Sequence, residues 1–455
     1  MKMTTTTDTL DRPLPTSSDE LMSIARDAVL FALPLYEMAR MRSATCCRRD
    51  RAGRFAGDSL ESTFRWANEW IHTRQLLGPQ NREVVTPNND TLYSSIWLDL
   101  TAGPLVLSVP DVGERYYVMG LLDFHTNPFG YIGSRTTGTS KGAFLLHGPD
   151  WQGETPPGMQ ALRCPTNAVW MIGRLLVDGP DDLARAVALQ DQFVIAPLEG
   201  SRATTLSLID AGLQPREHAS DPVRFARVVN RALAENPPPS EAKHHVERFV
   251  ACGIGPHCDA DAMTQAQRDA VELAIGQLRE ELAKPQPSAL GGGWFLPVDI
   301  GDSFGTRYFE RAQVALNYIG ALGIEEAMYV IADCDAAGQP LDGDTGYVLH
   351  FPAGGLPQTD AFWSLTAYDK VSCLLVENTA GRYSVGDRTP GMRYDGDGGL
   401  RIAITSQRPV DPVLQANWLP APAGPFYLTL RLYEPRTAHL SREFQYPSVE
   451  RIAPR

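Results

Sequence analysis

Hydrophobic positions near the start of the chain recur at the spacing of an α-helix. Apolar residues stand at positions 21, 24, 25, 28, 29, 31 and 32, which form one stripe of a helix. We therefore expect an amphipathic helix over residues 17–41, which Pro34 or the stretch 46–49 disrupts or ends. Residues 58–75 predict a second short helix that carries Phe64, Trp66 and Trp70. The polar, Thr-rich residues 1–18 predict a disordered lead-in, so the N-terminal helices span 19–75.

A different pattern follows, in which short apolar or alternating runs are separated by turn residues. Such runs lie at 92–100, 104–109, 116–122, 129–132, 143–146 and 168–177. Strands of this length at this spacing are typical of an antiparallel sandwich or barrel. We assign them to a first β domain over residues 76–200, which also holds a predicted helix at 181–192.

The middle of the chain returns to helical spacing. Helices are predicted at 221–234, 240–252, 264–283 and 306–322, with three prolines at 237–239 and a linker at 285–293. The last third alternates again, and strands are predicted at 328–332, 347–351, 362–368, 400–404 and 426–433. The sequence thus predicts a mainly β, multi-domain α+β protein. A helical segment over 201–325 separates the first β domain from a second one over 326–455.

The net charge and the cysteines indicate which partners the protein avoids and in which cellular compartment it resides. The 41 Lys and Arg residues stand against 54 Asp and Glu residues, and the resulting net charge of −13 argues against a nucleic-acid partner. The sequence has no run of about 18 apolar residues, so we expect no membrane association. Seven cysteines without a CxxC pair indicate reduced thiols and a soluble, cytoplasmic protein.

Three stretches of the first β domain resemble the bacterial domain of unknown function 1254. They are Thr-Pro-Asn-Asn-Asp-Thr-Leu-Tyr at 86–93, Arg-Tyr-Tyr at 115–117 and Ile-Gly-Arg-Leu-Leu-Val-Asp-Gly at 172–179. Three stretches of the second resemble its usual C-terminal companion, the domain of unknown function 1214. They are Phe-Trp-Ser-Leu-Thr-Ala-Tyr-Asp at 362–369, Asn378 with Arg-Tyr-Ser at 382–384, and Asn-Trp-Leu-Pro-Ala-Pro at 417–422.

The resemblance covers most of the chain from about residue 60 onward and implies a fold but no activity. The implied fold is an N-terminal β-sandwich, a helical insert and a C-terminal jelly-roll-like β-sandwich, and a fold alone does not supply a function. The chain departs from the family pattern at 253–258, Gly-Ile-Gly-Pro-His-Cys, and at 345–346, where Thr-Gly replaces a more usual Asn-Arg pair. If that arginine normally holds an anion, the ligand of this protein differs.

A polar cluster before the first long strand is a candidate binding site. Three amide or carboxylate side chains follow a proline and suit hydrogen bonding to a polar ligand, and a tyrosine lies just beyond them. An Asx turn that starts the strand explains the same residues. The candidates are Asn88, Asn89, Asp90 and Tyr93.

Asp123 and His125 form the one acid–base pair that the spacing suggests. Period 2 places them on one strand face with Tyr117, so the carboxylate could orient an imidazole that acts as general base. A polar sheet face or strand end without chemistry is the competing interpretation.

The second β domain offers aromatic, hydroxyl and arginine side chains. Ser364 and Tyr368 lie on the polar face of a strand whose opposite face carries Trp363. Arg382 and Arg431 are permanently charged and suit a carboxylate or a phosphate. We include all five residues as binding candidates. The competing interpretation is that they pack in an ordinary domain core.

No metal or cofactor is predicted. His and Cys residues at 244, 245, 252, 257 and 258 match no standard zinc spacing, and consecutive histidines on a helix point about 100° apart. The sequence contains no GxGxxG after a strand, no GxxxxGK[ST] and no GxSxG.

Two functions remain open at this point. The first is a hydrolase- or lyase-type enzyme without nucleotide or redox cofactor, which acts on a small polar or anionic substrate between the β domains, with Asp123 and His125 as catalytic pair. The second is a non-catalytic protein that binds a ligand, a glycan or a partner subunit through its jelly-roll-like domain. A homo-oligomer is expected for either.

Overall fold

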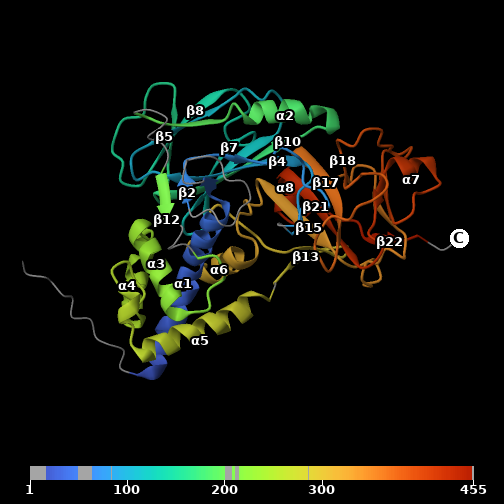
Figure 1. Ribbon diagram of the computed structural model, residues 1–455. Helices are drawn as coiled ribbons and strands as arrows, with labels where there is room; N and C mark the ends of the chain where they lie inside the picture. The colour runs from blue at the N-terminus through green and yellow to red at the C-terminus, as the bar shows by residue number, and fades with distance from the viewer. Residues whose placement is uncertain are drawn as a thin grey trace, which may run out of the picture.

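The computed structural model describes residues 17–49, 64–82, 85–199, 207–210, 215–284 and 286–452. These residues form a mainly β protein with several sheets and a helical segment in the middle of the chain, as the sequence predicted at this level. Figure 1 shows the helices α1, α3, α4, α5 and α6 (within residues 18–45 and 222–317) gathered below the N-terminal sheets, with the C-terminal strands beside both.

Two sheets of the N-terminal region share one core. The first has the order β3 (Ile71–His72), β4 (Thr91–Asp99), β10 (Ala168–Leu176), β6 (Tyr117–Asp123) and β7 (Pro128–Gly133). The second has the order β11 (Val194–Pro197), β5 (Leu105–Val109), β8 (Gly142–His147) and β9 (Gln160–Arg163). Leu92, Ile96 and Leu98 of β4 point into this core. Alternation therefore places Tyr93 and Trp97 on the opposite face, against the helical layer.

Part of the predicted second helix is a strand. β2 (Phe64–Ala67) pairs with β1 (Cys47–Arg49) and β12 (Ser207–Asp210). Residues 58–63, which the helix prediction also covered, lie outside the described residues. The spacing of Trp66 and Trp70 fits a helix. The pairing of this segment with β1 and β12 nevertheless makes it a strand.

The helical layer is built around one long helix, α1 (Ser18–Thr45), which contacts α3 (Pro222–Glu235), α5 (Gln265–Leu282) and α6 (Tyr308–Asn317). α4 (Lys243–Glu247) runs into a 3₁₀ turn at Arg248–Cys252, and α2 (Leu183–Gln190) belongs to the N-terminal β region. Pro34 lies buried inside α1 and does not end it, because packing on all sides of the helix outweighs the lost hydrogen bond.

The C-terminal region also has two sheets around one core. The larger has the order β13 (Ser288–Gly291), β14 (Trp294–Leu296), β15 (Ala327–Ala332), β21 (Phe426–Pro435), β17 (Thr359–Asp369) and β18 (Ser384–Gly386). The smaller has the order β20 (Trp418–Pro420), β19 (Leu400–Thr405), β16 (Tyr347–Phe351) and β22 (Val449–Arg451). Two short helices, α7 (Pro412–Ala416) and α8 (Thr437–Leu440), complete it. The predicted linker at 285–293 thus contains a strand.

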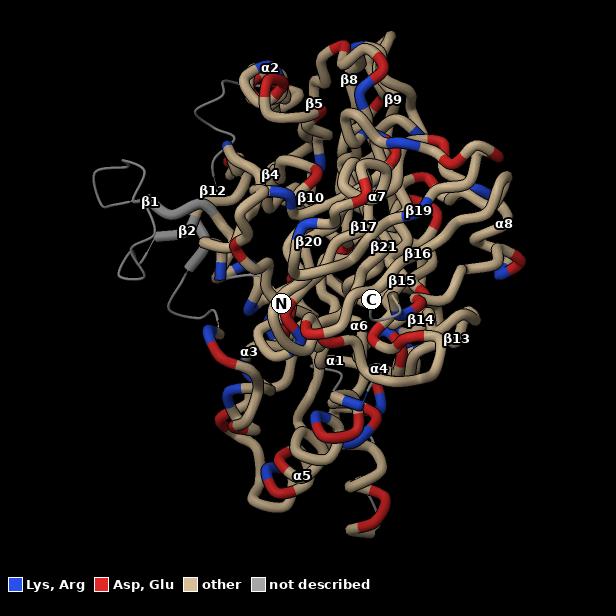
Figure 2. Tube along the Cα trace, turned by 90° about the vertical axis from the view of Figure 1, so that its right-hand side faces the viewer, with Lys and Arg blue, Asp and Glu red and all other residues tan. Residues whose placement is uncertain are grey.

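Charged residues of both signs are spread over the helices and loops at the periphery (Figure 2). Among the helices that the structure describes, none combines the length and the apolar character that crossing a bilayer requires.

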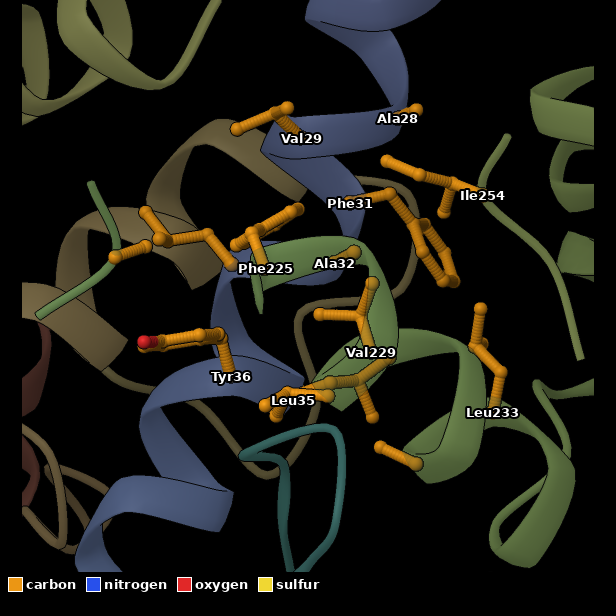
Figure 3. Packing of buried hydrophobic residues seen from close by; sticks show 14 of the residues in the cluster. Ala28, Val29, Phe31, Ala32, Leu35, Tyr36, Phe225, Val229, Leu233 and Ile254 are labelled. Carbon is orange, nitrogen blue, oxygen red and sulfur yellow. The ribbon is translucent and has the colours of Figure 1, made fainter. Parts of the chain in front are cut away.

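Phe31 lies at the centre of the helical layer. Its ring is fully buried and contacts the rings of Phe249 and Tyr308, with the Arg311 guanidinium 4.6 Å from its centroid. In Figure 3, Phe31 and Leu35 of α1 lie among side chains of α3 and Ile254. This packing ties the N-terminal helix to the middle of the chain.

We expect Phe31→Ala to lower the free energy of unfolding by about 3–5 kcal/mol, because it removes a fully buried ring and leaves a cavity. Denaturant unfolding measures the change. Leu273→Ala is the control, since Leu273 is 47% exposed and its truncation should cost less than about 0.5 kcal/mol. Equal losses in the two variants would contradict this assignment.

A candidate anion site between the two β domains

One face of the larger C-terminal sheet is polar and yet buried. Along β17 and β21 the apolar side chains point into the domain core, so alternation places Ser364, Thr366 and Tyr368 on the other face with Arg431 and Tyr433. Ser364 pairs with Arg431 across the strands, and Tyr329 of β15 pairs with Arg431 on the far side. The N-terminal domain covers this face.

The loop before β4 attaches the two domains to each other. The Thr86 N–H donates to the Cys373 carbonyl at 2.7 Å, and the Tyr368 hydroxyl donates to the Pro87 carbonyl at 2.6 Å. The Asn88 side chain accepts from the Asp90 N–H at 2.6 Å and donates to the Tyr433 hydroxyl at 2.5 Å. The same asparagine therefore shapes the turn and reaches the C-terminal domain.

Asp90 is the carboxylate of this interface. It is buried, and it accepts from the Ser364 hydroxyl at 2.6 Å and from the Ser384 hydroxyl at 3.5 Å. The Arg388 guanidinium lies 3.7 Å away and also contacts Asp178. The charge of Asp90 is thus satisfied by hydroxyls and by one arginine.

Arg431 donates only to neutral groups. It is 2% exposed, and its guanidinium reaches the Thr366 hydroxyl at 3.1 Å, the Thr86 carbonyl at 3.0 Å and the Tyr368 hydroxyl at 2.5 Å. Burial raises the pKa of Tyr368 to about 12, so this hydroxyl is neutral and adds no opposing charge.

Arg174 of β10 projects toward the same place from the other domain. It is 6% exposed, it donates to the Tyr329 hydroxyl, and its guanidinium lies 5.6 Å from the ring centroid of Tyr93 and 5.7 Å from that of Tyr329. Its Nε is buried and has no hydrogen-bond partner. Arg431 lies 5.8 Å from the same Tyr329 ring, so the two guanidinium groups flank one tyrosine.

Among the described residues, Arg174 and Arg431 have no direct ion pair. Within the described part of the chain, no carboxylate lies within 4.0 Å of the charged nitrogens of Arg174 or Arg431. Burial raises the pKa of Tyr93 and Tyr433, so these neighbours are neutral as well. A buried cation is costly unless it is paired, and arginines are suited to carboxylates and phosphates.

The family comparisons place this interface between two recognised domains. Models described as proteins of unknown function match the chain at residues 67–197 (DUF1254) and 326–437 (DUF1214), together more than half of its length. The chain belongs to the DUF1254–DUF1214 family. Arg174 lies in the first matched region, and Tyr329 and Arg431 lie in the second. These matches confirm the predicted resemblance to the two families and the order of the two domains.

A solved structure shows the same fold. The VPA0106 protein from Vibrio parahaemolyticus superposes with a TM-score of 0.73 at 26% identity, over 95% of this chain and 100% of that one. The similarity to a putative uncharacterized protein from Burkholderia cenocepacia is weaker, with a TM-score of 0.42 at 12% identity over 96% and 95% of the two chains. A comparison with curated proteins finds no match.

Six of the residues predicted for a site in this DUF1254–DUF1214 protein come together at the interface. These are Asn88, Asp90, Tyr93, Ser364, Tyr368 and Arg431. The sequence could not show that Asp90 and Ser364, which stand 274 residues apart, belong to one site, because only the docking of the domains brings them together.

Four other predicted binding residues lie elsewhere. Asn89 donates to the Leu77 carbonyl at 2.5 Å, and Arg382 donates to two backbone carbonyls at 3.0 Å. Tyr117 is buried between the N-terminal sheets, and Trp363 is buried in the C-terminal core. Asn89 and Arg382 therefore hydrogen-bond to the backbone, and Tyr117 and Trp363 fill the two domain cores.

Asp123 and His125 do not form the predicted acid–base pair. Both are buried, and the Asp123 carboxylate accepts from the backbone N–H groups of His125 and Asn127, each at 2.9 Å. The imidazole instead lies 3.2 Å from the Asn236 carbonyl, and burial lowers the pKa of His125 to about 3. Among the described residues, no hydrogen bond or ion pair joins the Asp123 carboxylate to the His125 ring, because the chain turns between β6 and β7 at this point.

Sequence reasoning missed Arg174, Tyr329, Tyr433 and Glu434. Arg174 did carry a signal, since it is the one charged residue in the apolar run of β10. A charge in a strand that is buried on both faces needs a partner, and here that partner lies in the other domain.

Glu434 is a second unusual carboxyl at the interface. It has a left-handed backbone, with φ of 52°, next to an irregularity in the β17–β21 register. Its Oε1 is buried without a hydrogen-bond partner, whereas neighbouring Glu326 accepts from Tyr116 and Arg135. Burial, and then the charges of Glu326 and Asp360, raise the pKa of Glu434 to about 7.

We expect Glu434→Gln to stabilise the protein above neutral pH. The side chain ionises near its ordinary pKa of 4.5 when the chain is unfolded and near 7 when it is folded. The wild type therefore loses stability relative to the variant as pH rises from about 4.5 to 7. Solvent screening of this half-buried side chain reduces the full effect of the shift to about 2 kcal/mol at pH 8.

Thermal unfolding from pH 4 to 8 measures this difference, which should vanish at pH 4. Glu450→Gln, at an exposed position, is the control and should track the wild type throughout. A Glu434→Gln curve parallel to that of the wild type across the range would show that Glu434 does not titrate as expected.

Proposed function

We propose that the protein binds a small organic anion between its two β domains and acts on it as a hydrolase or a lyase. The observation that carries the proposal is the pair of buried guanidinium groups of Arg174 and Arg431, which face one tyrosine from opposite domains. Neither has a carboxylate ion-pair partner among the residues that the structure describes. A carboxylate or phosphate supplied by a substrate would balance this charge.

The surroundings supply groups for proton transfer. The Ser364 hydroxyl donates to Asp90, and the Tyr329 hydroxyl accepts from Arg174. A lyase of this type removes a proton from the carbon next to the substrate carboxylate, and a fixed guanidinium stabilises the negative charge that develops there. These groups therefore favour a lyase. A hydrolase would use the same cations to stabilise a developing oxyanion.

Binding without turnover is the second candidate. Arg431 already donates to three neutral partners, so the site holds together without a reacting group. In this alternative the C-terminal domain presents a ligand or a partner subunit, and the protein assembles as a homo-oligomer. We further propose that the facing sheets of each domain form a sandwich, the C-terminal one of jelly-roll type, and that the protein is cytoplasmic.

We expect a small anion to raise the unfolding temperature of the wild type and not that of Arg174→Gln or Arg431→Gln. Inorganic phosphate, acetate and succinate are the probes, and at 100 times the Kd a ligand stabilises by about 2.7 kcal/mol. Each variant should weaken binding at least tenfold. Arg227→Gln removes an exposed arginine and should bind like the wild type.

Incubation of the same proteins with a metabolite extract, followed by mass spectrometry, separates the two candidates. Consumption of an anion by the wild type and by Arg227→Gln, but not by the two site variants, supports an enzyme. Co-purification of an anion without consumption supports the binding alternative. Equal behaviour of all four proteins in both assays would contradict an anion site at this interface.

A further inference from the structure

Thr429 of β21 carries a buried hydroxyl on the polar face of the larger C-terminal sheet. It is 1% exposed, and its Oγ1 has no hydrogen-bond partner among the described residues. Nε of Arg174, on the facing domain, is buried and unpartnered in the same way. Burial of a hydroxyl without a hydrogen bond costs free energy, so such a group is unusual in a folded protein.

Strand pairing places this hydroxyl beside the guanidinium of Arg431. Thr429 stands two residues before Arg431 on β21, so both side chains point to the same face. Arg431 pairs with Ser364 across the strands. Its guanidinium nevertheless donates to the Thr366 hydroxyl at 3.1 Å, and Thr366 is the residue that pairs directly with Thr429. The arginine side chain therefore leans along its own strand toward Thr429.

The polar groups nearest to Thr429 are committed to other partners. The Thr366 hydroxyl accepts from Arg431. The Tyr368 hydroxyl accepts from the same arginine and donates to a backbone carbonyl of the N-terminal domain at 2.6 Å. Ile331, which pairs with Thr429 on the other side, has an apolar side chain. The Thr429 hydroxyl therefore has a proton to donate next to a cation that attracts negative charge.

A small molecule can approach this part of the face along β15. Tyr329 pairs with Arg431, and Ile331 pairs with Thr429, so the two β15 side chains share the face of their partners. Both are only half-buried, whereas Thr366 on the β17 side is fully buried. Solvent therefore reaches the surroundings of Arg431 and Thr429 from β15.

We propose that Thr429 is a further binding residue of the anion site, and that its hydroxyl donates to one oxygen of a carboxylate or phosphate whose charge Arg431 balances. The inference rests on the proposed function. It adds how the anion is held, because a guanidinium and a hydroxyl that stand side by side suit an anion with two oxygen atoms. It also explains why a hydroxyl is buried here without a partner from the protein.

Thr429→Val removes the hydroxyl and keeps the shape of the side chain. Without ligand, the variant should unfold at the same temperature as the wild type or a higher one, because no hydrogen bond within the protein is lost. Its Kd for acetate and for inorganic phosphate, each measured by calorimetry, should rise about tenfold, since a hydrogen bond to a charged group is lost. Thr429→Ser, which keeps the hydroxyl, should bind both anions like the wild type.

Thr166→Val, in the N-terminal domain, is the matched control. Thr166 is also 1% exposed, but its hydroxyl accepts from the Phe124 N–H at 3.0 Å and donates to the Ala168 carbonyl at 2.7 Å. This variant should therefore unfold at a lower temperature and bind acetate like the wild type. Loss of stability and loss of binding are thus separated between the two threonines.

A wild-type Kd in Thr429→Val, with binding still weakened by Arg431→Gln, would overturn the role of Thr429 and leave the proposed function standing. Two further results would overturn it in the same way. One is a lower unfolding temperature of ligand-free Thr429→Val, which would show that the hydroxyl is already bonded within the protein. The other is equal weakening by Thr429→Ser, which would show that shape matters rather than the hydroxyl. Binding that is absent from the wild type, or unaffected by Arg431→Gln, would instead remove the proposed function itself.

Discussion

Buried positive charge at the contact between the two β domains is the constraint on which the rest of this structure depends. Arg174 and Arg431 come from different domains, and each is almost completely removed from water. Transfer of a cation out of water costs several kcal/mol unless hydrogen bonds and opposite charge compensate it. The Tyr329 hydroxyl hydrogen-bonds to Arg174, and Thr366, Tyr368 and the Thr86 carbonyl hydrogen-bond to Arg431. The charge of Asp90 acts on Arg431 without a direct ion pair, so its compensation of these two cations is incomplete.

The loop before β4 both forms a turn and joins the two domains. The sequence left open whether residues 88–90 form a turn or a binding site. Asn88 closes the turn onto the Asp90 N–H and also reaches Tyr433 of the other domain, while Asp90 accepts from Ser364. The turn chemistry that asparagine and aspartate favour in any protein here fixes the position of the Asp90 carboxylate in the interface.

Much of the fold could be predicted from local pattern, and the site could be predicted only in part. Period-2 alternation indicated the polar face of β17 correctly, because side-chain direction in a strand follows from backbone geometry alone. The same rule failed for Asp123 and His125, since the strand ends there and the chain turns. Arg382 and Arg431 look equivalent in sequence. Arg382, however, donates to backbone carbonyls of its own domain, whereas Arg431 lies under the N-terminal domain and donates to the Thr86 carbonyl. Only tertiary contacts distinguish them.

The pairing of the two domains in one chain follows from the same physics. By itself, the C-terminal sheet would expose Tyr329, Arg431 and Tyr433, and β10 would expose Arg174. Part of the contact between the domains is apolar, because Tyr116 of the first domain packs against the rings of Phe362 and Tyr433 of the second. The rest is made of hydrogen bonds that need partners from both sides, such as Asn88 to Tyr433 and Arg174 to Tyr329. Each of these bonds costs conformational freedom. The apolar cluster therefore supplies the adhesion between the domains, and the hydrogen bonds fix how they sit against each other.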